Sequence, residues 1–352
     1  MEQFAVILEK WYESHGRDLP WRATADPYRI WVSEIILQQT RVAQGYEYFM
    51  RFMERFPTVQ ALAGAADDEV MKLWQGLGYY SRARNLLAAA RDIVARGGTF
   101  PRTYEGVRAL KGVGDYTAAA ICAFAYGMPC AVVDGNVYRV LARWMGIGTP
   151  IDTSAGKKLF ASLARELLDE RHPALYNQAI MDFGALQCTP QSPGCASCPL
   201  ADTCVAFAEE RVTALPVKSH KTKVTVRHFN YLYVRSGSYT FIKKRDTDDI
   251  WRDLYELPLV ESPRAWDEGE LLASDRLRAW VDCPETMTLR CLRREVKHVL
   301  SHQVIYATFY ELTFPEGALP AFEGFLRVPI ADLERYAVPR LVHQFLEKFV
   351  FA

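Results

Sequence analysis

Four cysteines follow one another closely, in the pattern C-x6-C-x2-C-x5-C formed by Cys188, Cys195, Cys198 and Cys204. Thiolates at this density bind a metal or oxidise, and both zinc and an iron–sulfur cluster accept four of them. Zinc sites usually combine two short C-x2-C pairs, whereas this run has one such pair between longer gaps. The spacing therefore favours a [4Fe–4S] cluster and leaves zinc open, with the metal acting as a structural staple.

A second chemical pattern is the glycine-containing turn Leu110–Gly114, which separates two helical stretches. Such a turn at the start of a helix directs backbone N–H groups outward, and these can hold one phosphate. Gly112, Gly114 and the neighbouring Lys111 are therefore candidate DNA contacts, although a Gly-x-Gly turn is also an ordinary connector. Further along, Asp134 precedes an amphipathic helix, where the simplest role for an aspartate is an N-cap.

These residues belong to a chain that changes character near residue 210. Residues 1–206 predict helix after helix, because apolar residues recur at helical spacing between glycine and proline breakers. The polar, proline-containing stretch 207–223 is interpreted as a linker. Residues 224–352 predict an α+β domain, because β-branched and aromatic residues become frequent. Strands are expected at 229–234 and 304–310, and helical segments at 267–272 and 330–349.

The composition restricts the class of protein. Half of the residues are hydrophobic and 42 basic side chains balance 42 acidic ones, so large cores are expected and nucleic-acid binding by bulk charge is not. No apolar run is long enough for a membrane span, no secretory signal is expected, and the cysteine usage indicates a reducing, cytoplasmic compartment. The remaining cysteines show no pairing pattern and are expected to be buried free thiols: Cys122, Cys130, Cys283 and Cys291.

Taken together, residues 1–206 resemble the helix-hairpin-helix DNA glycosylases of the endonuclease III type. The segments that carry the resemblance are Ser33–Thr40, Gly76–Tyr80, Leu110–Gly114, Val133–Asn136 and the four cysteines. The resemblance implies an all-α glycosylase region with a six-helix domain that contains the hairpin, and a cluster domain formed by the N-terminal helix and residues 135–206. It further implies a [4Fe–4S] cofactor and double-stranded DNA bound in the cleft between these domains.

Within this superfamily, Tyr116 and Glu34 indicate one branch. Enzymes that also cut the DNA backbone carry a lysine two residues after the second hairpin glycine, where its amine forms a Schiff base with the sugar. This chain has Tyr116 there, and a phenol cannot form that adduct. With a tyrosine at this position, Glu34 and a second domain, the chain resembles the adenine glycosylases of the MutY type. The resemblance implies a monomeric, nucleoid-associated enzyme that hydrolyses adenine from pairs with 8-oxoguanine or guanine, without strand cleavage.

Residues 224–352 resemble the Nudix-like domain of that branch, which recognises 8-oxoguanine. Asp249–Pro258 matches its tryptophan-to-proline strand pattern. The glutamate-rich helix that holds magnesium in Nudix hydrolases is not found, because residues 294–298 read Arg-Glu-Val-Lys-His, so the domain is expected to bind and not to hydrolyse. Leu300–His302 matches a Phe-Ser-His loop with leucine in place of phenylalanine, and Ser301 is expected to donate to 8-oxoguanine.

The chemistry of this branch needs two carboxyl groups in different protonation states, because adenine leaves only when protonated and its departure leaves a cationic sugar. Glu34 lies in an apolar helical stretch that would raise its pKa, so it is predicted to protonate adenine N7. Asp134, beside a helix N-terminus, is predicted to stay ionised and to stabilise or attack the cation, with Tyr116 hydrogen-bonded to it. The structural alternative for Glu34 is a buried partner of an arginine such as Arg29 or Arg41.

Two groups of residues are expected to contact the DNA once the adenine has left the base stack. In the first group, Gln39 and Tyr79 are expected to enter the duplex and Thr40 and Leu77 to line the partner base. Gln38, beside Gln39, is a further candidate DNA contact. The group that lines the adenine pocket consists of Trp21, Arg22 and Gln178. Aromatic and apolar wedges can replace the lost stacking, although Tyr79 could equally be an aromatic that packs a helix.

Three other functions fit part of the pattern. A thymine-glycol or mismatch glycosylase of the same superfamily is disfavoured by the second domain, and the first of these also by Tyr116. A redox-sensing DNA-binding protein built around the cluster would not need Glu34 and Asp134. A hydrolase of free nucleotides would need the missing glutamate-rich helix.

Overall fold

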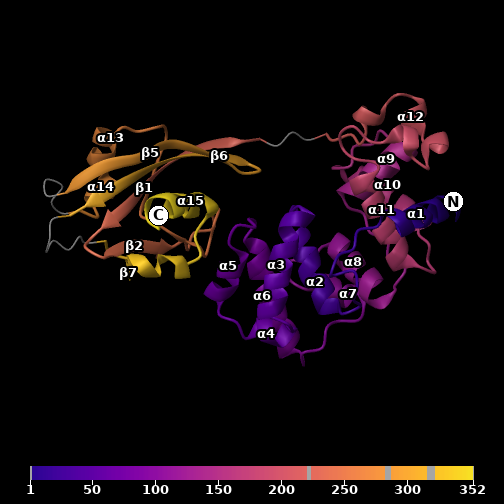
Figure 1. The fold of residues 1–352 in the computed structure, drawn as a ribbon, viewed down its shortest axis with the longest axis horizontal. Coiled ribbons are helices and arrows are strands. Elements are labelled where there is room, and N and C mark those ends of the chain that lie inside the picture. Colours follow the sequence, from indigo (N-terminus) through magenta and orange to yellow (C-terminus); the bar gives the residue numbers. More distant parts are fainter. Residues whose placement is uncertain (1, 220–222, 282–286, 315–321, 352) are drawn as a thin grey trace. The chain divides into compact units, whose positions relative to one another are not determined.

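The computed structural model describes residues 2–219, 223–281, 287–314 and 322–351, which fold into two compact units (Figure 1). The first unit comprises Met1–Gly64 and Asn85–Lys221, and the second comprises Ala65–Arg84 and Thr222–Ala352. The short segment 65–84 therefore groups with the C-terminal part of the chain, although it lies inside the stretch that the sequence predicts to be helical throughout.

The first unit is helical, as its sequence predicts. Its helices are α1 (Glu2–His15), α2 (Pro27–Leu37), α3 (Val42–Arg55), α4 (Val59–Ala63), most of α6 (Ser81–Ala95), α7 (Tyr104–Arg108), α8 (Asp115–Tyr126), α9 (Gly135–Trp144), α10 (Ser154–Glu166), α11 (Pro173–Leu186) and α12 (Val205–Ala208). The local sequence explains their ends. Asp26 caps α2, whose first residue is Pro27, and Gly127 adopts a φ of 62° to end α8.

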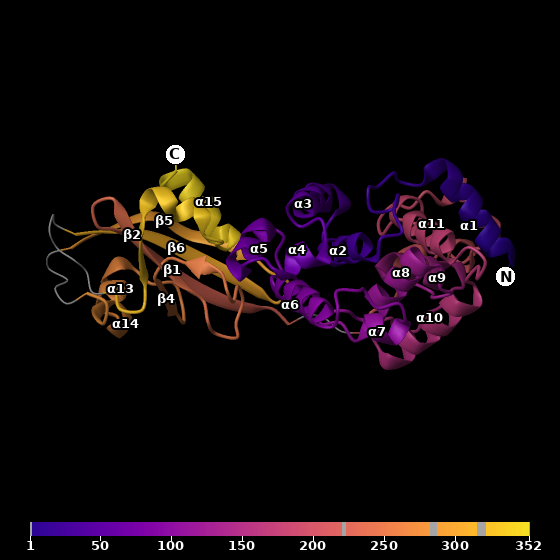
Figure 2. The ribbon, with the colours of Figure 1, turned by 90° about the horizontal axis from the view of Figure 1, so that it is seen from below.

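Helix α1 packs with α9, α10 and α11 around one core, although most of the first unit separates them in sequence (Figure 2). Leu8, Leu141 and Phe160 in this core are completely buried. Cys188, Cys198 and Cys204 lie at its edge, partly buried. The cysteine loop is therefore attached to the helices that carry and surround Asp134.

Helices α2 and α8 form a second buried contact. The segment Ile30–Ile36 of α2 is buried along its whole length, and so is Thr117–Ala123 of α8. Alanines at 118, 119, 120 and 123 let the two backbones approach closely. This contact fixes Glu34 and Tyr116, one on each helix, on neighbouring faces.

The second unit contains two sheets. The four-stranded sheet has the order β4 (Leu259–Ser262), β1 (Thr225–Arg235), β6 (Gln303–Thr313) and β5 (Thr288–Val299), and the three-stranded sheet has the order β3 (Tyr255–Glu256), β2 (Tyr239–Lys244) and β7 (Leu326–Pro329). Strands β1 and β6 run parallel, with Phe229 opposite Ala307. The strands predicted at 229–234 and 304–310 fall inside β1 and β6, which confirms them.

Helices α5 (Asp67–Trp74), α13 (Glu268–Ala273), α14 (Asp275–Arg278) and α15 (Arg340–Phe349) complete this unit. The helical segment predicted at 330–349 is interrupted, because it consists of a 3-10 turn (Ile330–Arg335), an extended stretch through Pro339, and α15. Phe345 of α15 stacks on Phe309 of β6, with ring centroids 4.3 Å apart. Asp68 of α5 accepts a hydrogen bond of 2.9 Å from the Tyr255 hydroxyl, which joins segment 65–84 to the second unit. No described helix is long and apolar enough to cross a membrane.

Candidate active site

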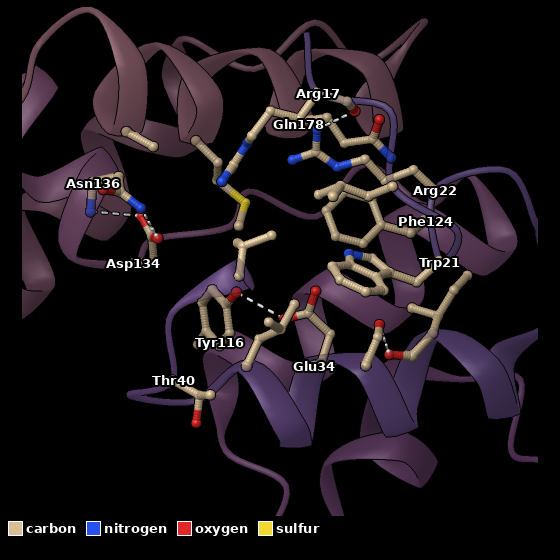
Figure 3. A pocket seen from close by; sticks show the side chains of 17 residues that line it. Arg17, Trp21, Arg22, Glu34, Thr40, Tyr116, Phe124, Asp134, Asn136 and Gln178 are labelled. Atoms are coloured by element: carbon tan, nitrogen blue, oxygen red, sulfur yellow. Dashed lines mark hydrogen bonds between the residues drawn. The ribbon is translucent and has the colours of Figure 1, made fainter. Parts of the chain in front are cut away.

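A cavity of about 180 Å³ lies among α2, α8 and α11 in the first unit, and Figure 3 shows the side chains that line it. It brings together seven residues that the sequence singles out: Trp21, Arg22, Glu34, Thr40, Tyr116, Asp134 and Gln178. Glu34 comes from α2, and Asp134 directly precedes α9. Two carboxyl groups from separate elements therefore line one small space.

Glu34 is 7% exposed, and the neighbouring residues Trp31, Ile35 and Ile36 of its helix are apolar and buried. Its Oε2 accepts a hydrogen bond of 2.7 Å from the Tyr116 hydroxyl. Burial raises the pKa of Glu34 to about 7, against the opposing effect of the Tyr116 hydrogen bond. The group is therefore partly protonated at neutral pH. Among the described residues no ion pair joins Glu34 to Arg29 or Arg41, and the arginine that favours its ionised form is Arg22.

Asp134 is the N-cap of α9, and its carboxylate is held by three donors. Oδ1 accepts from the backbone N–H groups of Asn136 and Val137, both at 2.8 Å, and Oδ2 accepts from Asn136 Nδ2 at 2.7 Å. Burial raises the pKa of Asp134, whereas these donors favour the ionised form. The predicted hydrogen bond from Tyr116 to Asp134 is wrong, because the phenol donates to Glu34 instead.

The side chain of Asn136 is itself fixed from the other direction. Arg139 donates from Nη2 to Asn136 Oδ1 at 2.8 Å and from Nε to the carbonyl of Cys188 at 2.7 Å. Gly184 of α11 makes this packing possible, since a Cβ there would stand 2.6 Å from Asn136 Cβ. Asp134 is therefore positioned by groups that reach the first cysteine.

Two arginines that line the cavity, Arg17 and Arg22, are held by a buried carboxylate that the sequence does not single out. Asp182, whose side chain is 0% exposed, accepts two hydrogen bonds of 2.7 Å from Arg22 and one of 2.9 Å from Arg17 Nε. These partners lower the pKa of Asp182 to about 2, against the effect of burial. Both guanidinium groups are thereby fixed against the cavity, beside Gln178 (Figure 3). The available signal was Asp182 itself, the single charged residue of helix α11.

The four cysteines of the loop line one small cavity, and none forms a disulfide. Burial raises the pKa of Cys198 to about 11, so its thiolate needs a cation to form. Arg143, 3% exposed, donates to Cys188 Sγ at 3.4 Å and to the carbonyls of Thr189 at 2.7 Å and Pro190 at 3.2 Å. The loop therefore offers four soft ligands in a preformed frame, which fits an iron–sulfur cluster.

The other cysteines fit the expectation in part. Cys122, Cys130 and Cys291 are free thiols, as predicted, but only Cys122 is buried, while the other two are half-buried. Cys283 lies outside the described residues.

Comparison with known proteins assigns the two parts of the chain. Residues 32–166 match the HhH-GPD superfamily of base excision DNA repair proteins, and residues 230–348 match the NUDIX domain. An adenine DNA glycosylase of Buchnera aphidicola subsp. Baizongia pistaciae is 32% identical over 86% of this chain and 84% of its own length. That of Schizosaccharomyces pombe is 37% identical over 97% of this chain and 88% of its own length.

The chain belongs to the adenine DNA glycosylase family. It is a DNA glycosylase, an enzyme that hydrolyses N-glycosyl bonds. The human adenine DNA glycosylase is 47% identical over 58% of this chain and 39% of its own length.

Two solved structures share the fold of the helical part of this chain. A thermostable thymine-DNA glycosylase superposes with a TM-score of 0.55 and 30% identity, covering 59% of this chain and 96% of its own. Endonuclease III, in a non-covalent complex with DNA, gives a TM-score of 0.52 at 21% identity, covering 59% of this chain and 95% of its own. The predicted architecture, a helix-hairpin-helix glycosylase region followed by a Nudix-like domain, is confirmed.

The glycosylase has a second cavity, of about 510 Å³, inside the second unit. Its lining includes Tyr79, which is predicted to enter the duplex, and Leu77, which is predicted to line the partner base. Ser301 and His302 of the predicted 8-oxoguanine loop line it as well. The hydroxyls of Tyr79 and Ser301 are hydrogen-bonded to each other. Tyr79 is 44% exposed with a φ of 45°, so it does not serve as a buried helix-packing aromatic.

The remaining predicted DNA contacts lie outside the linings of these two cavities. Gln38 lies at the end of α2 and donates from Nε2 to Thr117 at 3.2 Å, whereas Gln39 follows with a φ of 56°. Gly112 has a φ of 81°, and a Cβ there would stand 2.7 Å from Asn85. Gly114 is the N-cap of α8, and Lys111 between the helices is exposed. The turn therefore needs glycine at 112, and it exposes a lysine between α7 and α8.

Proposed function

We propose that this glycosylase removes adenine paired with 8-oxoguanine or with guanine in double-stranded DNA. The adenine leaves the base stack and enters the cavity between α2, α8 and α11, because a stacked base cannot reach carboxyl groups as buried as Glu34. The observation that carries the proposal is the pairing, around one cavity, of Glu34 with a pKa near 7 and Asp134 held by three N–H donors.

These two environments support an acid and an anion, respectively. Glu34 in its protonated form donates its proton to adenine N7, which makes the base a better leaving group. The C1′–N9 bond then breaks, and adenine departs with the electron pair while positive charge develops on the sugar. Asp134 stabilises that charge through its carboxylate, which its cap contacts hold in place. Glu34, now ionised, takes a proton from the water that attacks C1′.

Tyr116 supports base removal without strand cleavage. Its hydroxyl donates to Glu34, and no amine occupies this position to attack the sugar. A hydrolytic reaction therefore leaves an intact backbone with an abasic sugar.

The second unit supports recognition of the partner base. The cavity of about 510 Å³ in this unit combines the apolar Leu77 with the exposed ring of Tyr79 and the hydroxyl of Ser301. Tyr79 can stack on a base, and Ser301 can hydrogen-bond to the edge of 8-oxoguanine when it releases Tyr79. Leu300, in the place of an aromatic residue, lines the same cavity as an apolar surface.

The four cysteines support a resident [4Fe–4S] cluster held by Cys188, Cys195, Cys198 and Cys204. When bound, the cluster would cross-link the loop and would take no part in the reaction. Its value to this chain is mechanical, since the loop packs on the core that includes α9.

Single-turnover base release tests the proposal, with the purified enzyme and duplexes that hold adenine opposite 8-oxoguanine, guanine or thymine. We expect release of adenine opposite 8-oxoguanine and guanine, and no adduct trapped by borohydride. Survival of adenine opposite 8-oxoguanine while thymine is released from a mismatch would contradict the assignment. Ser301→Ala should reduce the preference for 8-oxoguanine over guanine, and Ser238→Ala, which alters an exposed serine elsewhere in the second unit, is the matched control.

A further inference from the structure

Tyr12 on α1 contacts two cavity residues without lining the cavity itself. Its hydroxyl donates to Oε1 of Gln178 at 2.9 Å and accepts from Nη1 of Arg22 at 3.2 Å. Gln178 and Arg22 both line the proposed adenine pocket, whereas Tyr12 does not. Tyr12 therefore acts on the pocket only through these two neighbours.

The direction of these hydrogen bonds is fixed by Arg22. A guanidinium group can only donate, and Asp182 holds this one through two hydrogen bonds of 2.7 Å. The oxygen of Tyr12 must therefore accept from Arg22, and its single hydrogen is directed to Gln178. If the amide of Gln178 were reversed, two donors would meet at the Tyr12 oxygen and the phenol hydrogen would lose its acceptor.

The amide of Gln178 consequently has a defined orientation. Its oxygen is occupied by Tyr12, which leaves the Nε2 group for the cavity. Among the residues that the structure describes, none accepts a hydrogen bond from this Nε2. The wall thus presents a hydrogen-bond donor to whatever base occupies the cavity.

We propose that Tyr12 is a positioning residue that orients the Gln178 amide so that it donates to an unprotonated ring nitrogen of the target base. The proposal rests on the proposed function, since it takes adenine as the occupant. Adenine carries acceptor nitrogens at N1 and N3, in addition to the N7 that Glu34 protonates. Guanine carries a hydrogen on N1, so at that position it would oppose donor to donor.

Adenine analogues test the orientation directly. Duplexes with 1-deazaadenine or 3-deazaadenine opposite 8-oxoguanine each lack one acceptor. We expect the wild-type enzyme to release at least one of them about tenfold more slowly than adenine, and Tyr12→Phe to reduce that gap to less than about threefold. Tyr126→Phe is the matched control, because its partly buried hydroxyl donates to a carbonyl, that of Pro101, far from Gln178 in sequence.

The outcomes separate the two proposals. If the wild-type enzyme releases no adenine, the proposed function fails. If it releases adenine but Tyr12→Phe retains the full gap between adenine and both analogues, the role of Tyr12 is refuted while the function stands. If Tyr12→Phe does not fold, Gln178→Leu replaces it: a gap abolished by Gln178→Leu supports the amide as the donor, and a gap that persists overturns the proposal.

Discussion

Replacement of Glu34 by glutamine tests the central electrostatic argument, because it keeps the shape of the side chain and removes its ionisation. Glu34 is 7% exposed, and burial raises its pKa from 4.5 to about 7. This difference corresponds to about 3 kcal/mol, since one pH unit is worth about 1.36 kcal/mol. The folded protein therefore binds this proton more tightly than the unfolded chain does.

The sign of the effect on stability follows from that preference. Because the folded-state pKa is the higher one, the stabilisation by the bound proton is complete below pH 4.5 and is lost as the pH rises through 7. Between pH 5 and pH 8 the wild-type enzyme should lose on the order of 2 to 3 kcal/mol of unfolding free energy relative to Glu34→Gln. Other titrating groups are common to both proteins and cancel in the comparison.

The assay is denaturant unfolding of both proteins from pH 5 to pH 9, together with single-turnover adenine release. Release should fall about 10²- to 10⁴-fold in Glu34→Gln, since a general acid is lost. In the wild-type enzyme, release should decline above pH 7 as Glu34 ionises. The exposed Glu105, changed to glutamine, controls for the loss of one charge. A stability difference that does not change between pH 5 and pH 8 would refute the assignment of Glu34 as a buried, proton-binding acid.

Three further changes test other parts of the site. Asp134→Ser and Asp134→Ala should both abolish adenine release. In thermal unfolding only the alanine variant should lose about 1 kcal/mol of stability, because serine can still cap α9. Equal stabilities of the two variants would mean that the cap contributes little. Asp182→Asn should lower the unfolding free energy by about 3 kcal/mol at neutral pH, and the difference should shrink as the pH falls from 4 towards 2, where the wild-type carboxylate is protonated as well; a difference independent of pH would contradict the ion-pair account. Cys198→Ser should reduce iron content and DNA affinity in purified protein before it changes the rate of the chemical step on bound DNA, and a slower chemical step at unchanged affinity would contradict the mechanical role.

The sequence predicts the architecture well because its signals are local. The period of the apolar residues changes from helical to alternating near the linker, and the strands at 229–234 and 304–310 lie within β1 and β6. Pro339 interrupts the predicted C-terminal helix, a local signal that the apolar periodicity on both sides obscured. The grouping of Ala65–Arg84 with the second unit depends on long-range contacts such as Asp68 with Tyr255, which no local pattern encodes.

The site could be predicted where a residue belongs to a motif, and not where it acts through a neighbour. Glu34, Tyr116 and Asp134 do line one cavity, as expected of residues that share a reaction. The partner of Tyr116 was predicted incorrectly, because the choice between two nearby carboxyl groups depends on how α2 and α8 pack. Asp182 and Tyr12 could not be predicted, because their partners are distant in the chain: Arg22 for Asp182 and Gln178 for Tyr12.

Helix α9 has Asp134, the proposed catalytic carboxylate, at one end and the cysteine loop at the other. It runs from Gly135 to Trp144, so its ten residues span about 15 Å. Arg143 fastens the far end to the loop through Cys188, Thr189 and Pro190. A tilt of about 4° about that end would move Asp134 by about 1 Å, a misplacement that can slow an enzyme about 10²-fold. The loop thus limits how far α9 can tilt before Asp134 is misplaced. A distortion of the loop that is too small to unfold the protein would still reduce the activity.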